Sequence, residues 1–504
     1  MKRIFFLALS VVISITGFAQ SNTSYRAESF GSLASGEYTP FWITNQNWGV
    51  NSLDANNFYV RGGIFHEQRI NKDWSFQVGA DIVSGNSSPY GNIWVQQLYG
   101  RIDWKIWRLD IGSREDYMSA LNPYLSSGDF IQSNNARPIP EIKISIPEYL
   151  LVPHTNESFF IKGNFAVGKF LDNEWMKERA EPALQNYVQD HLSHHKSIYF
   201  RFGDITNRHK MQFTVGMQHY AQWGAAIYNY QKNYEDGSWF YKKIKDPVGL
   251  DDFYRIVIAK EGSPSGSESS SAYIAGSQWG AYLFKYDYLL KDQSIISAYI
   301  HHFFEDGSGM VFENYRDNLL GIEYNSGKKS LLSGAVFEYI YSKQQTGPIH
   351  HNMMMDEEHK HLKNKGNGND NYYNNVDYVQ GPSHFGRTLG TPLFLSPAYN
   401  TDGSLEFKSS RIIAFHLGVN GYFNPSLQYR LMLTTGRSWG RYYLPYTSVK
   451  EGFASLVELR YSFPKIKEFE LKANLAYDKG EFFSGNSFGG SISLIKRGIL
   501  RSKQ

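Results

Sequence analysis

The sequence predicts an all-β fold, a transmembrane β-barrel of the outer-membrane type. Three observations favour it: segments of about ten residues in which apolar and polar side chains alternate, an N-terminal export signal, and a high aromatic content in a chain of polar average. Successive side chains of a strand point to opposite faces, so sustained alternation requires one apolar and one aqueous surface. The wall of a membrane barrel has lipid outside and water within.

The clearest alternation covers residues 469–478. One face carries Phe469, Leu471, Ala473, Leu475 and Tyr477, and the other carries Glu470, Lys472, Asn474, Ala476 and Asp478. The same period recurs in segments that start near residues 76, 107, 142, 159, 198, 211, 282, 427 and 488. With the short turns and long polar stretches between them, such as 230–251, these segments indicate about 16–20 strands, and an even number is expected.

Residues 1–19 have the features of a cleaved secretory signal. Lys2 and Arg3 precede a mostly apolar run over residues 4–15, and small residues lead up to cleavage after Ala19. The alternative, an N-terminal membrane anchor, is disfavoured because the run is shorter than the roughly 20 residues that span a bilayer.

Composition also favours a barrel over other classes. Aromatic residues make up 16% of the chain although its mean hydropathy is −0.44, as expected when rings gather at two membrane interfaces while lumen and loops are polar. No later stretch approaches 18 apolar residues, which excludes helical spans. The net charge of +3 gives no reason to expect nucleic acid as a partner, and a chain without cysteine has neither disulfides nor thiolate metal sites.

After the signal, we expect an N-terminal lead-in over residues 20–57 and a barrel over 58–504 that carries two insertions. Residues 171–197 lack the two-residue period and contain helix formers, although Pro182 should kink or divide the helix. This insertion is expected to plug the barrel or cap one mouth. The second insertion is a long loop over residues 344–397. An array of soluble β-sandwiches would also alternate, but the large rings on the outward faces favour the barrel.

Two parts of the long loop contain residues suited to binding. Residues 350–361 include four His, three Met and three acidic side chains, which are potential ligands of zinc or copper. A Lys-, Asn- and Gly-rich stretch follows, so we favour a mobile, solvated loop and predict no metal site. Tyr372, Tyr373 and Asn374 are candidate polysaccharide-binding residues, since rings stack on sugars and amides bond hydroxyls; ordinary aromatics of a barrel rim are an equal alternative.

Motifs of enzymes are missing from the sequence. It contains no His-Glu-x-x-His pair, no phosphate-binding loop and no EF-hand loop. The Gly-x-Ser-x-Gly match at residues 485–489 precedes a predicted strand, whereas a nucleophile elbow requires a strand, a turn and then a helix. We therefore expect no catalysis and no cofactor.

Three stretches of the chain have the form of family motifs. The most specific is Ser-Asn-Asn-Ala-Arg-Pro-Ile-Pro-Glu-Ile at residues 133–142. The others are Tyr-Thr-Pro-Phe-Trp at 38–42, with residues 45–49 following, and His-His-Lys-Ser-Ile-Tyr-Phe-Arg at 194–201. In sequence, order and spacing these stretches resemble the capsule assembly Wzi family, and the resemblance covers most of the mature chain.

The resemblance implies an outer-membrane barrel of about eighteen strands, in line with the strand count, and a helical plug for which residues 171–197 are the natural candidate. It also implies a lectin-like role, holding exported capsular polysaccharide on the surface of a Gram-negative cell without catalysis. We expect a monomer whose partners are this or another surface polysaccharide and outer-membrane lipid. A porin-like diffusion channel for small solutes is the alternative function.

Three residues of the Asn-Ala-Arg-Pro-Ile-Pro region are further candidates for polysaccharide binding. Asn134, Asn135 and Arg137 follow a loop and precede a predicted strand, and an arginine there is suited to an anionic sugar. Internal anchoring of the barrel by Arg137 is an equal alternative.

Overall fold

A computed structural model of the protein describes residues 20–86, 89–205, 209–267, 274–345 and 370–503. The predicted signal peptide and the histidine- and methionine-rich stretch 350–361 lie outside the described residues. The predictions about these two segments therefore stay predictions.

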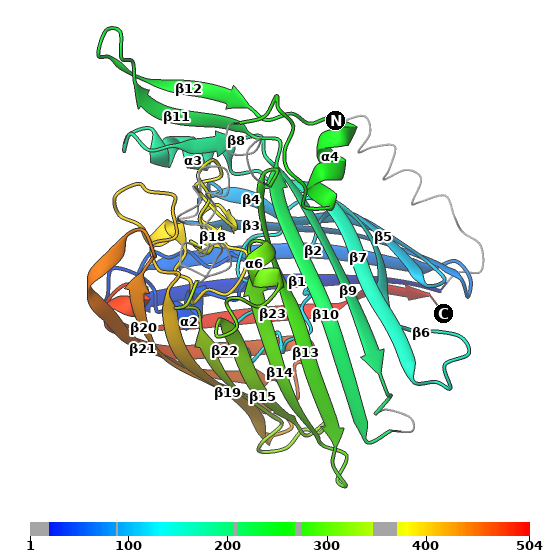
Figure 1. The fold of residues 1–504 in the computed structure, drawn as a ribbon. Helices are drawn as coiled ribbons and strands as arrows, with labels where there is room; N and C mark the ends of the chain where they lie inside the picture. The colour runs from blue at the N-terminus through cyan, green and yellow to red at the C-terminus, as the bar shows by residue number, and fades with distance from the viewer. Residues whose placement is uncertain (1–19, 87–88, 206–208, 268–273, 346–369, 504) are drawn as a thin grey trace.

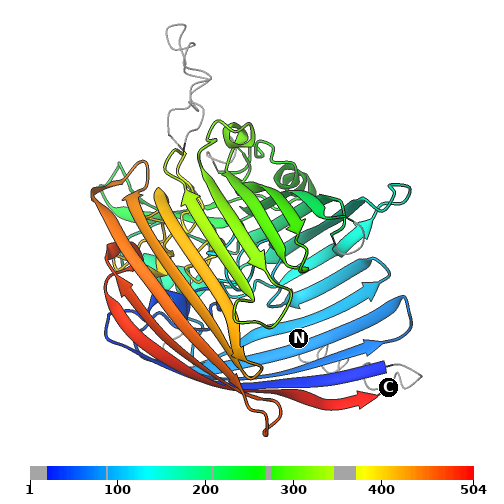
Figure 2. The same cartoon turned by 90° about the horizontal axis from the view of Figure 1, so that it is seen from below.

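The described chain forms a closed antiparallel barrel of 18 strands (Figures 1 and 2), which confirms the predicted fold class. Each of the alternating segments predicted above lies in the wall. The wall strands are β1 (Gln20–Ala34), β2 (Asn57–Arg69), β3 (Trp74–Gly85), β4 (Ile93–Trp104), β5 (Trp107–Ser113), β6 (Glu141–Leu151), β7 (Phe159–Lys169), β9 (Leu192–Phe202), β10 (Met211–Trp223), β13 (Ser277–Leu289), β14 (Ile295–Phe304), β15 (Asn318–Asn325), β16 (Gly334–Tyr341), β19 (Ile412–Asn424), β20 (Leu427–Gly440), β21 (Pro445–Ser462), β22 (Phe469–Lys479) and β23 (Ser487–Lys503).

Strand β1 closes the barrel, so the expected lead-in over residues 20–57 is wrong for residues 20–34, while residues 35–56 lie outside the wall strands. It pairs with β2 on one side and with β23 on the other, which satisfies the backbone groups of both edges. The strand escaped notice because three successive outward positions are the small residues Ala27, Ser29 and Gly31, and only Tyr25 and Leu33 on that face are large. Alternation is visible in a sequence only where the two faces differ in polarity.

The outer surface of the wall is apolar, as the alternation predicted. In β22, Leu475 and Tyr477 are 54% and 42% exposed, whereas Ala476 and Asp478 are each 2% exposed. The large apolar side chains therefore face outward and the polar ones face the lumen, the reverse of a soluble protein. Such a surface requires contact with lipid.

The two ends of the barrel differ in the length of their connections. At one end the turns are short, such as residues 70–73 between β2 and β3 and residues 425–426 between β19 and β20. At the other end lie the long connections, among them residues 35–56, 114–140 and 342–411. We call this second end the long-loop mouth; in outer-membrane barrels the longer loops are the extracellular ones.

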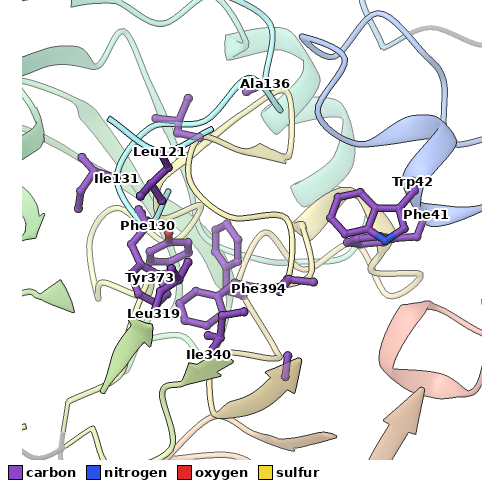
Figure 3. Packing of buried hydrophobic residues seen from close by; sticks show 14 of the residues in the cluster. Phe41, Trp42, Leu121, Phe130, Ile131, Ala136, Leu319, Ile340, Tyr373 and Phe394 are labelled. Atoms are coloured by element: carbon purple, nitrogen blue, oxygen red, sulfur yellow. Dashed lines mark hydrogen bonds between the residues drawn. The ribbon is translucent and has the colours of Figure 1, made fainter. Parts of the chain in front are cut away.

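Three long connections fold back into the lumen. We call their described parts, residues 35–56, 114–140 and 370–411, the plug. One cluster of side chains exposed by 2% or less joins the plug to the wall (Figure 3), and it includes Phe41, Trp42, Phe130, Ile131, Leu319, Ile340, Tyr373, Phe394 and Phe407. Burial of each large apolar side chain is favourable by roughly 1.5–3 kcal/mol, so the plug is packed in the manner of a protein core.

The plug is irregular chain, which corrects the expected helical plug over residues 171–197. Only α3 (Asn173–Ala180) of that insertion is helical, and Pro182 follows directly after its C-cap because proline cannot continue the helix. The wall resumes at Leu192. Helix α3 lies at the long-loop mouth (Figure 1), and no helix in the described ranges is long and apolar enough to cross a bilayer.

The outward orientation of the wall can be tested at Ile322 of β15, which is 58% exposed. The Ile322→Arg variant should lose about 2–4 kcal/mol of unfolding free energy in liposomes if the residue faces hydrocarbon near the bilayer midplane. Ile322→Leu is the matched control, because it keeps the apolar volume. Urea titration of folded and unfolded forms in lipid measures the difference, and equal stability of the two variants would contradict a lipid-facing position.

Candidate functional site at the long-loop mouth

The stretch at residues 38–42 fixes the first segment of the plug to distant wall strands. It leads into α2 (Phe41–Thr44), where the Phe41 N–H donates to Asp478 Oδ2 of β22 at 2.6 Å. The Trp42 Nε1–H donates to Thr434 Oγ1 of β20 at 3.0 Å. Because both aromatic rings are buried in the lumen, this stretch joins the plug to the wall and offers no surface to a ligand.

The residues after α2 contact the Asn-Ala-Arg-Pro-Ile-Pro region. The Gln46 N–H donates to Asn135 Oδ1 at 3.0 Å, and the Trp48 N–H donates to the Asn134 carbonyl at 2.7 Å. Asn135 is fully buried, and its Nδ2 donates to the Thr388 carbonyl at 3.1 Å. Asn135 therefore bonds two other segments of the plug at once, so the hydrogen bonds of its side chain are made within the protein.

Arg137 joins the same region to the wall. Its guanidinium lies against two rings that contact each other, at 4.9 Å from the centroid of Tyr90 and 5.4 Å from that of Phe385, and its Nη2 donates to the Val95 carbonyl at 2.7 Å. Gly49 packs closely on this group with φ of +67°. A Cβ at this position would lie 2.7 Å from the Tyr90 hydroxyl oxygen, so only glycine fits. The geometry of Arg137 is that of an internal anchor, the alternative left open by the sequence.

The third stretch with a family resemblance, residues 194–201, lies in β9 and meets the second. His195 Nε2 and Glu141 Oε2 are 2.8 Å apart, and Lys143 Nζ lies 3.1 Å from the other oxygen of Glu141. A cavity of about 30 Å³ beside these residues and Arg137 has room for water but not for a sugar ring. All three stretches therefore converge on the junction between plug and wall.

Tyr372 and Tyr373 lie in the core of the plug. They are 0% and 1% exposed, so neither ring can stack on a sugar in this conformation. The Tyr372 hydroxyl donates to Asp317 Oδ2 at 2.8 Å, and the Tyr373 hydroxyl donates to the Phe130 carbonyl. Asn374 is half-buried, and its Nδ2 donates to a backbone carbonyl of the plug at 3.0 Å. These three predicted site residues hold the plug together.

Three buried carboxyl groups from two connections, residues 170–191 and 305–317, hold this part of the plug in place. Burial raises the pKa of Asp172 and of Asp317 to about 7, and it raises the pKa of Glu305 well above its usual range. The bonds are Tyr373 N–H to Glu305 Oε1 at 2.6 Å, Tyr372 O–H to Asp317 Oδ2 at 2.8 Å, and Phe385 N–H to Asp172 Oδ2 at 2.9 Å.

A small antiparallel sheet covers part of the long-loop mouth (Figure 1). Strand β11 (Ala226–Lys232) pairs with β12 (Trp239–Lys245) on one side and with β8 (Tyr187–Gln189) on the other. We call this the mouth sheet. It shares a buried apolar cluster with the plug, which includes Val188, Ile227, Tyr378, Val379 and Leu405. The mouth sheet is therefore fixed on top of the plug.

The face of the mouth sheet opposite Val188 and Ile227 carries a row of aromatic rings. The strand register places five rings on this face, and successive ring centroids are 4.7 Å apart for Tyr228–Tyr187, 5.5 Å for Tyr187–Tyr241, 5.1 Å for Tyr241–Tyr230 and 5.2 Å for Tyr230–Trp239. Tyr187, the second ring of the row, is 2% exposed, and Trp239 at the outer end is 58% exposed. We call it the aromatic row. Flat rings with a polar edge are suited to contact with sugars.

The aromatic row was not predicted, because residues 230–251 have the composition of a polar loop. A signal was present, since β12 begins with three aromatic residues in succession, Trp239 to Tyr241, and aromatic residues are enriched in strands. Seven residues between two polar stretches are too short a segment to distinguish a strand from a loop by period alone. The neighbouring strand, which sets the register, lies across a turn.

No protein-family model matches the sequence, and no curated protein matches it. Solved structures do match the fold. Wzi of Escherichia coli, titled an outer-membrane protein involved in group 1 capsule assembly and a carbohydrate-binding β-barrel, is 12% identical with a TM-score of 0.55; the match covers 94% of this chain and 83% of Wzi. OccAB2 of Acinetobacter baumannii is 9% identical with a TM-score of 0.47 and coverages of 95% and 98%.

The fold is that of an outer-membrane β-barrel. At 12% identity the similarity to Wzi shows the fold and no more. The strand number predicted from the family resemblance, about eighteen, is confirmed. Within the described ranges, no group of three or more His, Asp or Glu side chains is arranged to hold a metal ion.

The buried carboxyl groups predict that the plug loosens as the pH rises. A carboxyl whose pKa is raised by folding stabilises the fold fully below its ordinary pKa, and this contribution is lost as the pH rises to the raised value. Hydrogen exchange of the backbone amides in residues 370–391, corrected for intrinsic rates, should show weaker protection at about pH 8 than at about pH 5. The loss should occur between the ordinary pKa of an aspartate, 3.8, and about 7.

A double variant, Asp172→Asn with Asp317→Asn, provides the control for this pH dependence. An amide oxygen still accepts the hydrogen bonds from the plug but does not ionise in this range. Its protection should change less between the two pH values. Equal protection of the unmodified protein at both values would contradict the assignment.

Proposed function

We propose that this protein is a monomeric outer-membrane barrel of a Gram-negative bacterium that binds surface polysaccharide, such as capsule, and holds it at the cell surface without catalysis. The single observation that carries the proposal is the long-loop mouth, where a packed plug supports a sheet with an exposed aromatic row. Such a mouth is suited to holding a polymer outside the barrel.

The plug favours a binding role over the alternative of a porin-like channel. A diffusion channel needs a water-filled lumen, whereas Phe130, Tyr373 and Phe394, which are no more than 1% exposed, belong to a continuous apolar cluster inside the barrel. The carboxyl groups that bind the plug come from connections outside it, which secures the plug against displacement.

The similarity to Wzi supports the same role from a second direction. That protein is titled a carbohydrate-binding β-barrel, and its fold aligns with 94% of this chain. The three stretches that resemble its family hold plug to wall, as shown above, so the resemblance supports a shared plugged architecture. The ligand-binding residues must then be sought on the exposed surface of the loops, where specificity usually resides.

Deletion of the gene tests the proposed function. Cells without the protein should shed surface polysaccharide into the medium, and expression of the full-length protein should restore the cell-bound fraction. Quantification of cell-bound and released polysaccharide after gentle centrifugation measures both. Equal retention with and without the protein would refute the proposed role.

Conductance distinguishes the proposed role from the porin. In planar bilayers the purified protein should be electrically silent or show only brief openings, because the plug fills the lumen. A deletion of residues 370–391 provides a comparison, since removal of this plug segment should raise conductance if the variant still folds. A steady open conductance of the unmodified protein would favour the porin.

A further inference from the structure

We propose that the aromatic row and the lysines beside it form the binding site for an acidic polysaccharide, which docks along the outer face of the mouth sheet. This inference rests on the proposed function and names both the site and the chemical class of its ligand. It is independent of the residues that the sequence first indicated, which lie in the plug.

The geometry of the row suits an extended polymer. Its outer part consists of Tyr230, Tyr241 and Trp239, and neighbouring rings in it are 5.1 Å and 5.2 Å apart. Tyr230 and Tyr241 are half-buried, so each is held in place while part of its ring is open to solvent. Rings fixed by their neighbours lose little conformational entropy when a ligand binds. An elongated ligand can therefore contact several rings in succession.

The charge of the sheet selects an acidic polymer. Strands β8, β11 and β12 contain four lysines and no Asp or Glu. Three of the lysines, Lys232, Lys243 and Lys245, share the face of the aromatic row, and all are exposed. None of them forms an ion pair with a described residue. Opposite charge on a ligand would be attracted to this face.

Acidic residues also lie near the sheet. Asp190 is neutralised by its ion pair with Lys169 at 2.9 Å. Glu181, which accepts a hydrogen bond from a tyrosine of the row at 2.6 Å, and Asp236 and Glu235 in the turn between β11 and β12 keep their negative charge, because the hydrogen bonds they accept come from neutral groups. The four lysines of the three strands outnumber these three carboxylates, and three of the lysines lie on the face of the row.

The position of the sheet favours a polymer over a lipid surface as its occupant. Its inner face is buried on the plug through Val188 and Ile227, both 0% exposed, so the sheet lies over the mouth and not against the outer wall. Asp246, at the end of β12, accepts a hydrogen bond from the Tyr378 hydroxyl of the plug at 2.9 Å. The register places the row on the face of the sheet opposite this buried one.

The alternation of β12 supplies matched controls on the same hairpin. Trp239 belongs to the row, whereas Phe240 is a 41% exposed aromatic residue on the opposite face. Lys243 belongs to the row face, whereas Lys242, which is also exposed, lies on the opposite face. Variants of the two faces therefore differ in orientation and hardly at all in residue type.

The test measures binding of the full-length protein in detergent to polysaccharide purified from the surface of the cells that make it. The polymer is used in its native form and after chemical reduction of its carboxyl groups to alcohols. Trp239→Ala combined with Tyr230→Ala should weaken binding of the native polymer about tenfold or more, as loss of a central aromatic contact does. Phe240→Ala should bind as the unmodified protein does.

The lysines are tested by charge and by salt. The triple variant Lys232→Gln, Lys243→Gln, Lys245→Gln should weaken binding of the native polymer and lose most of the salt dependence, because screening acts on exposed charges. Lys242→Gln should retain both. The carboxyl-reduced polymer should bind the unmodified protein more weakly, and equal binding of the two polymers would overturn the assignment of an acidic ligand.

Two outcomes separate failure of this inference from failure of the proposed function. If the unmodified protein binds the polymer and the Trp239, Tyr230 variant binds it equally well, the site lies elsewhere while the proposed function stands. If the unmodified protein binds no polymer and its deletion leaves polysaccharide retention unchanged, the proposed function fails. If the Trp239, Tyr230 variant still binds the polymer but no longer binds phosphatidylethanolamine–phosphatidylglycerol vesicles, the row belongs to a membrane contact and the inference is overturned.

Discussion

Backbone hydrogen bonding in a medium without water is the constraint on which the rest of the structure depends. Each N–H and C=O group of the wall that faces hydrocarbon must find its partner within the protein, so an open sheet edge is costly and the sheet has to close on itself. The pairing of β1 with β23 provides that closure. A closed wall then fixes which side chains meet lipid and which enter the lumen, and it defines a space that the long connections can fill.

The plug meets a second requirement, because irregular chain inside the barrel must also pair its polar groups. Asn135, Arg137 and Asp478 do this with backbone groups of other segments. Carboxyl groups such as Asp317 and Asp172 do it at the price of a raised pKa, which ties the order of the plug to pH. The stretches that resemble the Wzi family make several of these internal bonds, and they join the plug to the wall.

The mouth sheet depends in turn on the plug. Val188 and Ile227 are buried in a cluster that contains plug residues, and Tyr187 is held by Glu181 from the segment after α3. The aromatic row is therefore rigid at its inner end and open at its outer end. Such a surface combines the fixed geometry of a folded core with exposure to large polymers, which cannot enter a lumen filled by the plug.

The sequence by itself determined the class of fold, the membrane environment and the approximate number of strands, since side-chain alternation records directly which two media a strand separates. It could not reveal β1, most of whose outward residues are small or polar, nor the burial of Tyr372 and Tyr373. It also gave no indication that Trp239, Tyr230 and Tyr241 form one row. Only the tertiary structure decided these points, because burial and register depend on partners that are remote in the chain or lie across a turn, and local sequence carries no record of them.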